Sequence, residues 1–189
     1  FEGPLIDDPF AFWGPRALTV DDQGNVYVAD TGNKRVQVYG PNGQFIRQIG
    51  AAGVLEGQLD EPVGIDISSD GRLFVADTWN QRIEVFTQEG EYLYQWPISA
   101  WYAQTNERPY LHVDEQGIVY VSDPEGSRIL VFDSNGLYLY SFGDYTTLKL
   151  AGPMVTDGEG FLYVVDIADS IIQRYDIRLF APPVQQPGR

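Results

Sequence analysis

The sequence predicts an all-β protein made of four repeated antiparallel sheets that stack face to face around a common axis. Three observations support this fold class. The pattern VYVADTGNKRVQVYGPNG, which starts at residue 26, returns at residues 73, 119 and 162. Its aspartates lie 47, 46 and 43 residues apart, a period that suits one four-stranded unit. No segment keeps apolar residues at the helical spacing i, i+3, i+4, i+7 for more than one turn.

Each repeat is expected to contain four strands in chain order. A first strand such as ALTV or GIDI leads through a glycine turn to NVYVAD, RLFVAD, IVYVSD or FLYVVD. These second strands are apolar on both alternating faces, so both faces must be covered. After the aspartate, a four-residue turn precedes RVQVY, RIEVF, RILVF or IIQRY, and a second turn precedes FIRQI, YLYQW or YLYSF. Radial stacking of such sheets is the β-propeller architecture, and the last repeat offers only DIRLF as a poor outer strand.

The amino-acid sequence of the first two repeats resembles a known family. VADTGNKRVQVY and VADTWNQRIEVF, each preceded by PRALTVDDQGNVY or PVGIDISSDGRLF, are closely similar to NHL repeats. The resemblance covers residues 12–180 and implies a β-propeller of four-stranded antiparallel blades, with four NHL-like blades present out of the roughly six typical of the family. The third repeat departs at residues 124–127, which read PEGS, and the fourth places Ile171 where the others have arginine.

Three segments follow from this reading. Residues 1–14 are expected to be the end of a preceding blade or a ring-closing strand, residues 15–180 the propeller blades, and residues 181–189 a proline- and glutamine-rich tail. Four blades closed by the N-terminal segment are one alternative. An arc that is part of a larger ring, and of a longer protein, is the favoured one.

The composition excludes some partners. The formal net charge of −15 predicts no binding to nucleic acid. No run of 18 apolar residues occurs, so we expect no membrane insertion by this segment. The absence of cysteine leaves the compartment open, and a bacterial extracellular or cell-envelope location is favoured over the cytoplasm.

The repeated aspartates are expected to be structural turn residues. A carboxylate at a strand end accepts hydrogen bonds from backbone N–H groups two or three residues on, and an arginine five residues later can bridge the turn. Asn33 and Asn80 are expected to adopt positive φ in these turns. The turn residues so predicted are Asp30, Asp77, Asp123 and Asp166, with Arg35, Arg82 and Arg128.

One position on the innermost strands offers a candidate for chemistry. Counting back from each aspartate, the repeats place Thr19, Asp66, His112 and Val155 at equivalent positions. A carboxylate beside the only histidine suits a general base or a pair of metal ligands. A plain hydrogen bond between blades would look the same, and we expect that role. No zinc, calcium or phosphate-binding motif is present, so no cofactor is predicted.

The loop WPISAWYAQTNERPY at residues 96–110 suggests a contact patch. Exposed tryptophan, tyrosine and arginine carry much of the binding energy at protein interfaces. The predicted contact residues are Trp79, Trp101, Tyr102 and Arg108. In the alternative interpretation, Trp96 ends an outer strand and Trp101 fills the gap between two blades.

Two functions follow from these features. The first is a non-catalytic binding or scaffolding module that docks a partner. A protein is the expected partner, and a carbohydrate is the alternative. The second, implied by the family resemblance, is a metal-dependent propeller enzyme of lactonase or lyase type. It would use Asp66 and His112 at the axis.

Overall fold

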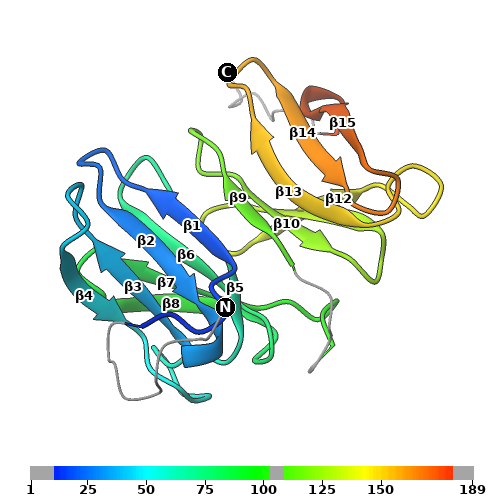
Figure 1. Ribbon diagram of the computed structural model, residues 1–189. Coiled ribbons are helices and arrows are strands. Elements are labelled where there is room, and N and C mark those ends of the chain that lie inside the picture. Colours follow the sequence, from blue (N-terminus) through cyan, green and yellow to red (C-terminus); the bar gives the residue numbers. More distant parts are fainter. Residues whose placement is uncertain (1–10, 103–108, 181–189) are drawn as a thin grey trace, which may run out of the picture.

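The computed structural model describes residues 11–102 and 109–180, which form fifteen β-strands in four antiparallel sheets (Figure 1). Within each sheet the strands pair in chain order. The first sheet contains β1 (Ala17–Val20), β2 (Val26–Asp30), β3 (Arg35–Tyr39) and β4 (Phe45–Ile49); the second contains β5 (Pro62–Ile67), β6 (Arg72–Asp77), β7 (Arg82–Thr87) and β8 (Tyr92–Pro97); the third contains β9 (Leu111–Val113), β10 (Val119–Asp123), β11 (Arg128–Phe132) and β12 (Tyr138–Phe142); and the fourth contains β13 (Ala151–Thr156), β14 (Phe161–Asp166) and β15 (Ile171–Asp176).

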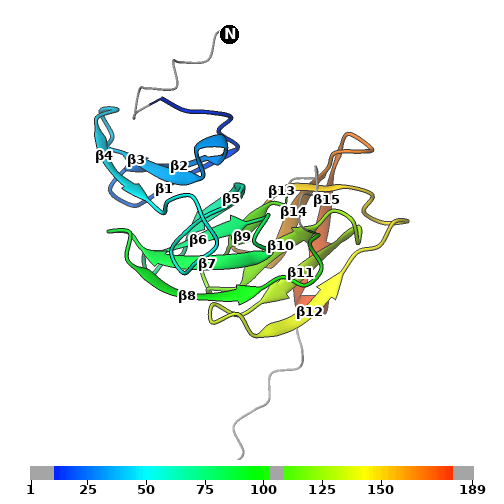
Figure 2. The same ribbon diagram turned by 90° about the horizontal axis from the view of Figure 1, so that it is seen from below.

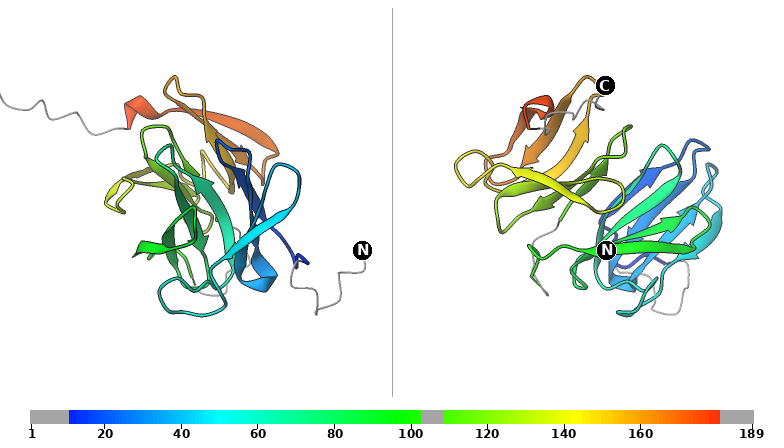
Figure 3. Two further views of the ribbon diagram at one scale, coloured as in Figure 1. Left: turned by 90° about the vertical axis from the view of Figure 1, so that its left-hand side faces the viewer. Right: turned by 180° about the vertical axis from the view of Figure 1, so that it is seen from behind.

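The sheets are the blades of a β-propeller, as the repeats predict. The first strand of each blade lies innermost, and β1 packs against β5, β5 against β9, and β9 against β13. Figures 2 and 3 show the blades following one another around this inner row, with the first and fourth blades at its two ends. No helix in the described part of the chain is long and apolar enough to cross a membrane.

Three apolar cores lie between successive blades. Between the first and second blades, Tyr27 and Val38 pack with Leu73 and Phe86. The cores between the second and third blades and between the third and fourth blades use residues at corresponding positions. The second and third blades therefore bury one face against the blade before them and the other against the blade after them, which explains why their second strands are apolar on both faces.

The fourth blade has three strands in the described residues. After β15 the chain forms a 3-10 turn at Ile177–Leu179, where the oxygen Oδ1 of Asp176 accepts a hydrogen bond from the N–H of Arg178 at 3.2 Å. The segment DIRLF, expected as a poor outer strand, is thus the end of β15 and this turn. The expected tail at 181–189 and most of the expected segment 1–14 lie outside the described residues.

The turns after the aspartates differ from the sequence expectation in one respect. Positive φ falls on Lys34, at 56°, and on Gln81, at 57°, rather than on the asparagines that precede them. The asparagine side chains are used instead as donors, because each amide bonds to its aspartate at 2.8 Å. The prediction of positive φ at Asn33 and Asn80 is therefore wrong by one residue.

Candidate functional site

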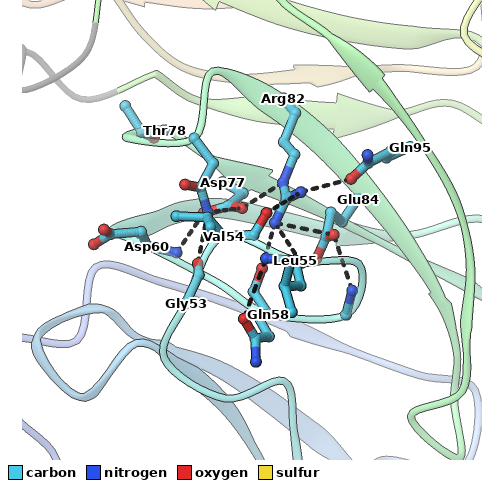
Figure 4. Close-up of polar contacts among 12 residues, drawn as sticks. Gly53, Val54, Leu55, Gln58, Asp60, Asp77, Thr78, Arg82, Glu84 and Gln95 are labelled. Atoms are coloured by element: carbon cyan, nitrogen blue, oxygen red, sulfur yellow. Dashed lines mark hydrogen bonds and ion pairs between the residues drawn. The ribbon is translucent and has the colours of Figure 1, made fainter.

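The aspartate turn of the second blade is a buried polar cluster (Figure 4). The Oδ1 atom of Asp77 accepts the backbone N–H of Asp60 at 2.6 Å. Its Oδ2 atom accepts from Nδ2 of Asn80 and from Nε of Arg82, both at 2.8 Å. Burial raises the pKa of the Asp77 carboxyl above its usual value, although these hydrogen bonds oppose the rise.

The guanidinium of Arg82 fixes the connection that joins the first and second blades. Its two terminal nitrogens donate to three backbone carbonyls of that connection and to a side chain of β8. The acceptors are the carbonyl oxygens of Val54 at 3.1 Å, Leu55 at 3.0 Å and Gln58 at 2.6 Å, and Oε1 of Gln95 at 2.8 Å. Arginine suits this role because its planar fork offers five donors.

The same arrangement recurs in the other blades with local differences. Asp30 accepts from the N–H of Trp13 at 2.7 Å and from Arg35 at 2.9 Å. Asp166 has no arginine and accepts from the N–H of Lys149 at 2.9 Å. In the first, second and fourth blades the N–H donor lies 17 residues before the aspartate.

The third blade keeps the arginine and loses the asparagine. Asp123 accepts from Nε of Arg128 at 2.8 Å and from the N–H of Gly126, three residues on, at 3.0 Å. Every aspartate turn thus either bridges to its arginine or holds the connection before it. Strands β2 and β4 run in the same direction, so the turns and the connections share one end of the molecule, which we name the connection face.

Glu84 is a buried carboxyl that the sequence did not single out. Its Oε1 atom accepts the N–H of Gly57 at 3.1 Å and lies 3.2 Å from Nη2 of Arg82. Its Oε2 atom is buried and has no hydrogen-bond partner among the described residues. Burial is the main cause that raises the pKa of Glu84 to about 7. The only sign of this burial in the sequence was the position of Glu84 within the apolar strand RIEVF.

The predicted pair on the inner strands does come together. The Nδ1 atom of His112 lies 2.9 Å from Oδ2 of Asp66. On the other side of this pair, the hydroxyl of Thr19 donates to Oδ1 of Asp66 at 3.0 Å. The Nε2 atom of His112 lies 2.9 Å from Oγ1 of Thr156. A chain of side-chain hydrogen bonds therefore links β1, β5, β9 and β13, one residue from each blade.

The fourth member of this chain is Thr156 and not Val155, which the repeat alignment had placed there. Val155 keeps the register of the other inner strands, because it pairs with Tyr163 as Asp66 pairs with Phe74 and His112 with Tyr120. Val155 is exposed instead. Thr156 is the next residue along the strand and lies on its other face, so an alignment of equivalent positions missed its contact with His112.

The hydrogen-bonding capacity of Asp66 and His112 is used within the protein. The N–H of Thr156 donates to Nε2 of His112 at 3.1 Å, so Nε2 carries the lone pair and Nδ1 the hydrogen. Asp66 also accepts the N–H groups of Ile67 and Val113, each at 2.9 Å. Burial would raise the pKa of Asp66, but the hydrogen bonds from His112 and the backbone hold it below its usual value.

This saturated pair is poorly suited to chemistry. A cavity of about 280 Å³ lies between the inner strands, and Asp66 and His112 line it with Gly64, Tyr110 and Met154. A general base needs a free lone pair facing the cavity, and both partners have theirs occupied. Across residues 11–102 and 109–180, no group of three His, Cys, Asp or Glu side chains is placed to hold a metal ion.

The predicted contact residues fall into three groups. Trp101 is only 2% exposed, and its Nε1 donates to the carbonyl of Ser122 at 3.0 Å. With Trp96 it belongs to the core between the second and third blades, as the alternative interpretation stated, so its place in a contact patch was wrong. Tyr102 is 66% exposed and Trp79 is 37% exposed, with Lys34 5.8 Å from the Trp79 ring centre. Arg108 lies outside the described residues.

Two exposed apolar residues on the connection face were missed from the sequence. Val54 and Leu55 turn their carbonyls to Arg82 while their side chains are 66% and 67% exposed. They lie in AAGVLEGQ, a glycine-containing connection without hydrophobic periodicity, so the sequence did not predict which side chains are exposed.

Stacked antiparallel blades joined by repeated aspartate turns define this chain as a repeat protein of the β-propeller class. The model of the NHL repeat matches residues 12–39 and 59–86. The first two blades therefore match NHL repeats, as the sequence resemblance indicated, within a chain whose fold is a β-propeller. No curated protein matches it in sequence.

Solved structures share its fold at low sequence identity. A streptogramin B lyase is 16% identical with a TM-score of 0.65, over 86% of this chain and 54% of that one. A virginiamycin B lyase from Staphylococcus aureus is 13% identical with a TM-score of 0.64, over 86% and 55%. A gluconolactonase from Xanthomonas campestris is 19% identical with a TM-score of 0.61, over 82% and 55%. This chain thus spans about half the length of these proteins.

Proposed function

We propose that this propeller is a non-catalytic binding module that docks a protein partner on its connection face, as part of a larger assembly or a longer protein. One observation carries the proposal: this face presents exposed apolar and aromatic side chains on a rigid frame. They are Val54, Leu55, Trp79 and Tyr102. Side chains of this kind supply the central contacts of protein interfaces.

The frame beneath these side chains is fixed by buried polar contacts. Arg82 holds the backbone of Val54 and Leu55, and the N–H of Trp79 donates to the carbonyl of Asp60 at 3.1 Å. A surface whose backbone is fixed before binding loses less conformational entropy when a partner docks. Lys34, near Trp79, adds a cation beside the aromatic ring on a chain that is otherwise acidic.

The test is capture of a protein with the 189-residue chain as bait, comparing three single variants with the unmodified protein. Trp79→Ala and Tyr102→Ala should each weaken a bound protein at least tenfold if these side chains are central contacts. Leu137→Ala is the matched control, because Leu137 is 65% exposed in the turn between β11 and β12 at the opposite end. It should bind as the unmodified chain does.

The outcome decides between the functions considered for this chain. If Leu137→Ala abolished capture of a protein and Trp79→Ala did not, the binding site would lie elsewhere and the proposal would be contradicted. Hydrolysis or elimination of a lactone substrate that disappears in His112→Ala would instead establish the enzyme. Binding of an oligosaccharide to the same aromatic residues would replace the protein partner by a carbohydrate.

A further inference from the structure

A cavity of about 440 Å³ lies between the second and third blades, bounded by β8 and the connection after it on one side and by β11 and β12 on the other. This volume suits a small organic molecule. The lining is mostly apolar, with one cation. It includes Trp96, Ile98, Arg128, Leu130, Phe132 and Tyr138.

The cation of this cavity is Arg128, at the start of β11. Its Nε donates to Oδ2 of Asp123 at 2.8 Å. Its terminal nitrogens Nη1 and Nη2 have no hydrogen-bond partner within residues 11–102 and 109–180. The Arg128 side chain is accordingly 42% exposed, whereas that of Arg82 is 9% exposed. A guanidinium in this state offers the pair of parallel N–H donors that binds one carboxylate.

The gap between the first and second blades contains the same arginine with its site filled (Figure 4). There, Nη2 of Arg82 lies 3.2 Å from Oε1 of Glu84, two residues later on the strand. The third blade has Leu130 at the position of Glu84, seven residues after the aspartate of its turn. The fold thus places a carboxylate beside the arginine in one gap and replaces it by an apolar side chain in the next.

The connections before the two arginines also differ. The first connection covers its arginine, because three of its carbonyls accept hydrogen bonds from Arg82. The second connection turns inward at Trp101, whose N–H donates to the carbonyl of Ile98 at 3.1 Å. The carbonyl of Trp101 accepts from Nε2 of Gln81 at 2.7 Å. The described part of the second connection therefore gives Arg128 no acceptor.

An apolar wall continues from the arginine along β11. Leu130 and Phe132 follow Arg128 on the same face of the strand, because side chains alternate between faces. Four residues of strand place Phe132 about 13 Å from Arg128. The Tyr138 ring stands edge-on to Phe132 with the centroids 5.7 Å apart, and Trp96 faces Phe132 across the gap at 6.0 Å. A molecule that matches this lining has a carboxylate at one end and an aromatic body.

We propose that this cavity binds an organic monocarboxylate with an aromatic body. The carboxylate pairs with Nη1 and Nη2 of Arg128, and the aromatic body packs on Leu130 and Phe132. A single negative charge is specified because Asp123 already neutralises part of the cation and the whole chain carries a net charge of −15. The same chemical group occurs in free aromatic acids and at the C-terminus of a peptide that ends in phenylalanine.

The test is a titration of the 189-residue chain with hydrocinnamate, a phenyl ring on a short carboxylate chain. The reporter is the indole N–H signal of Trp96 in nuclear magnetic resonance spectra, since this N–H has no acceptor in the described part of the chain. The signal should shift with a Kd of about 1 mM or lower. An ionic strength of about 0.15 M screens the net charge of the chain beyond about 8 Å.

Two further probes separate charge from shape and identify the source of the carboxylate. Hydrocinnamamide has nearly the same shape without the charge, so it should bind at least tenfold more weakly. N-acetyl-glycyl-phenylalanine presents the phenyl ring and carboxylate at the end of a peptide. Tighter binding of this peptide than of hydrocinnamate would identify a chain terminus as the ligand, and the reverse order would identify a free acid.

Substitutions assign the binding to Arg128. Arg128→Gln should weaken hydrocinnamate at least tenfold and leave hydrocinnamamide unchanged. Leu130→Glu supplies the carboxylate that Glu84 supplies in the second blade, so it should also weaken the acid. Arg178→Gln is the matched control, because it removes the same charge from an arginine that is 59% exposed in the fourth blade. It should bind as the unmodified chain does.

Three results would overturn the proposal. They are a Trp96 signal that does not move up to the solubility limit of the acid, equal affinities for the acid and the amide, and an acid affinity that Arg128→Gln leaves intact. Arg128→Gln changes a partly exposed side chain, so it remains informative if Leu130→Glu does not fold. Neither substitution changes Trp79 or Tyr102, so partner capture and acid binding can fail independently.

Discussion

Glu84 occupies in the second blade the place that Gln37 occupies in the first. Each is fully buried and lies seven residues after the aspartate of its turn. Nε2 of Gln37 donates to Oδ2 of Asp30 at 3.0 Å, and its Oε1 accepts from the hydroxyl of Tyr39 at 2.5 Å. A carboxylate has no hydrogen to donate, and the tyrosine is replaced by Phe86, so Oε2 of Glu84 is left without a partner.

Glu84→Gln should therefore stabilise the protein at neutral and higher pH. Burial raises the pKa of Glu84 from 4.5 to about 7, so stability is greatest below the lower value and is lost as pH rises through about 7. The full difference is on the order of 3 kcal/mol. Urea unfolding between pH 5 and pH 9 should show this loss in the unmodified chain and much less in the variant. The reverse change, Gln37→Glu, should introduce it into the first blade; equal pH slopes in all three proteins would contradict the assignment.

Arg82→Met should destabilise the protein by about 3 to 5 kcal/mol, because it leaves the buried Asp77 and Glu84 without their cation. It also leaves three carbonyls of the connection without a donor. The control is Arg128→Met, whose side chain is 42% exposed and which pairs only with Asp123 among the described residues. That change should cost about 1 kcal/mol or less. Similar urea midpoints for the two variants would show that the connection is not held in this way.

Asp66→Asn should cost about 2 to 3 kcal/mol, because the amide nitrogen cannot accept the hydrogen bonds that one carboxylate oxygen now accepts. The pKa of Asp66 is lowered, so its contribution is complete above its ordinary value of 3.8 and is lost as pH falls through the lower folded value. The stability difference between the two proteins should accordingly shrink in acid. Thr19→Val removes a single hydrogen bond and should cost about 1 kcal/mol. A difference that stays constant down to pH 2 would refute the role given to the carboxylate.

Chelation should leave the melting temperature unchanged, since the hydrogen-bonding atoms of Asp66 and His112 are already occupied. Added calcium, magnesium, manganese or zinc should likewise have no effect beyond that of ionic strength. A metal that bound the folded state at 100 times its Kd would raise stability by about 2.7 kcal/mol. Such a rise, absent in Asp66→Asn, would restore the metal-dependent enzyme.

Trp101→Ala should destabilise the protein by about 3 to 5 kcal/mol, because a buried indole and its hydrogen bond to Ser122 are both lost. The adjacent residue provides the comparison. Tyr102→Ala should change stability by no more than about 0.5 kcal/mol, because the side chain is exposed. Thermal and urea unfolding of the pair would measure this contrast; comparable losses would mean that Tyr102 is also structural.

The sequence predicted the architecture because the information is repeated and local. A two-residue alternation, glycine turns and an aspartate with arginine five residues later were sufficient to place the strands of the first three blades. The joining of Asp66 and His112 also followed, because equivalent positions on neighbouring inner strands lie side by side. These features depend on the repeat alone.

The departures arise where tertiary packing overrides the local pattern. Trp101 lies in a connection with no periodicity, so its burial depends on the gap between two blades. Thr156 contacts His112 in place of Val155, because the residue after the equivalent position is the one that reaches the imidazole. Glu84 looked like an ordinary strand residue, and its unusual pKa results from a connection that covers it.

The spacing of 17 residues between a connection N–H and its aspartate has a consequence for how such chains change in evolution. Each of the three blades with this spacing contains both the aspartate and the N–H group that bonds to it, so duplication or loss of one gene segment adds or removes a complete unit. No junction elsewhere has to be rebuilt. Propellers of this kind can therefore gain or lose whole blades while each blade keeps the contacts it needs to fold.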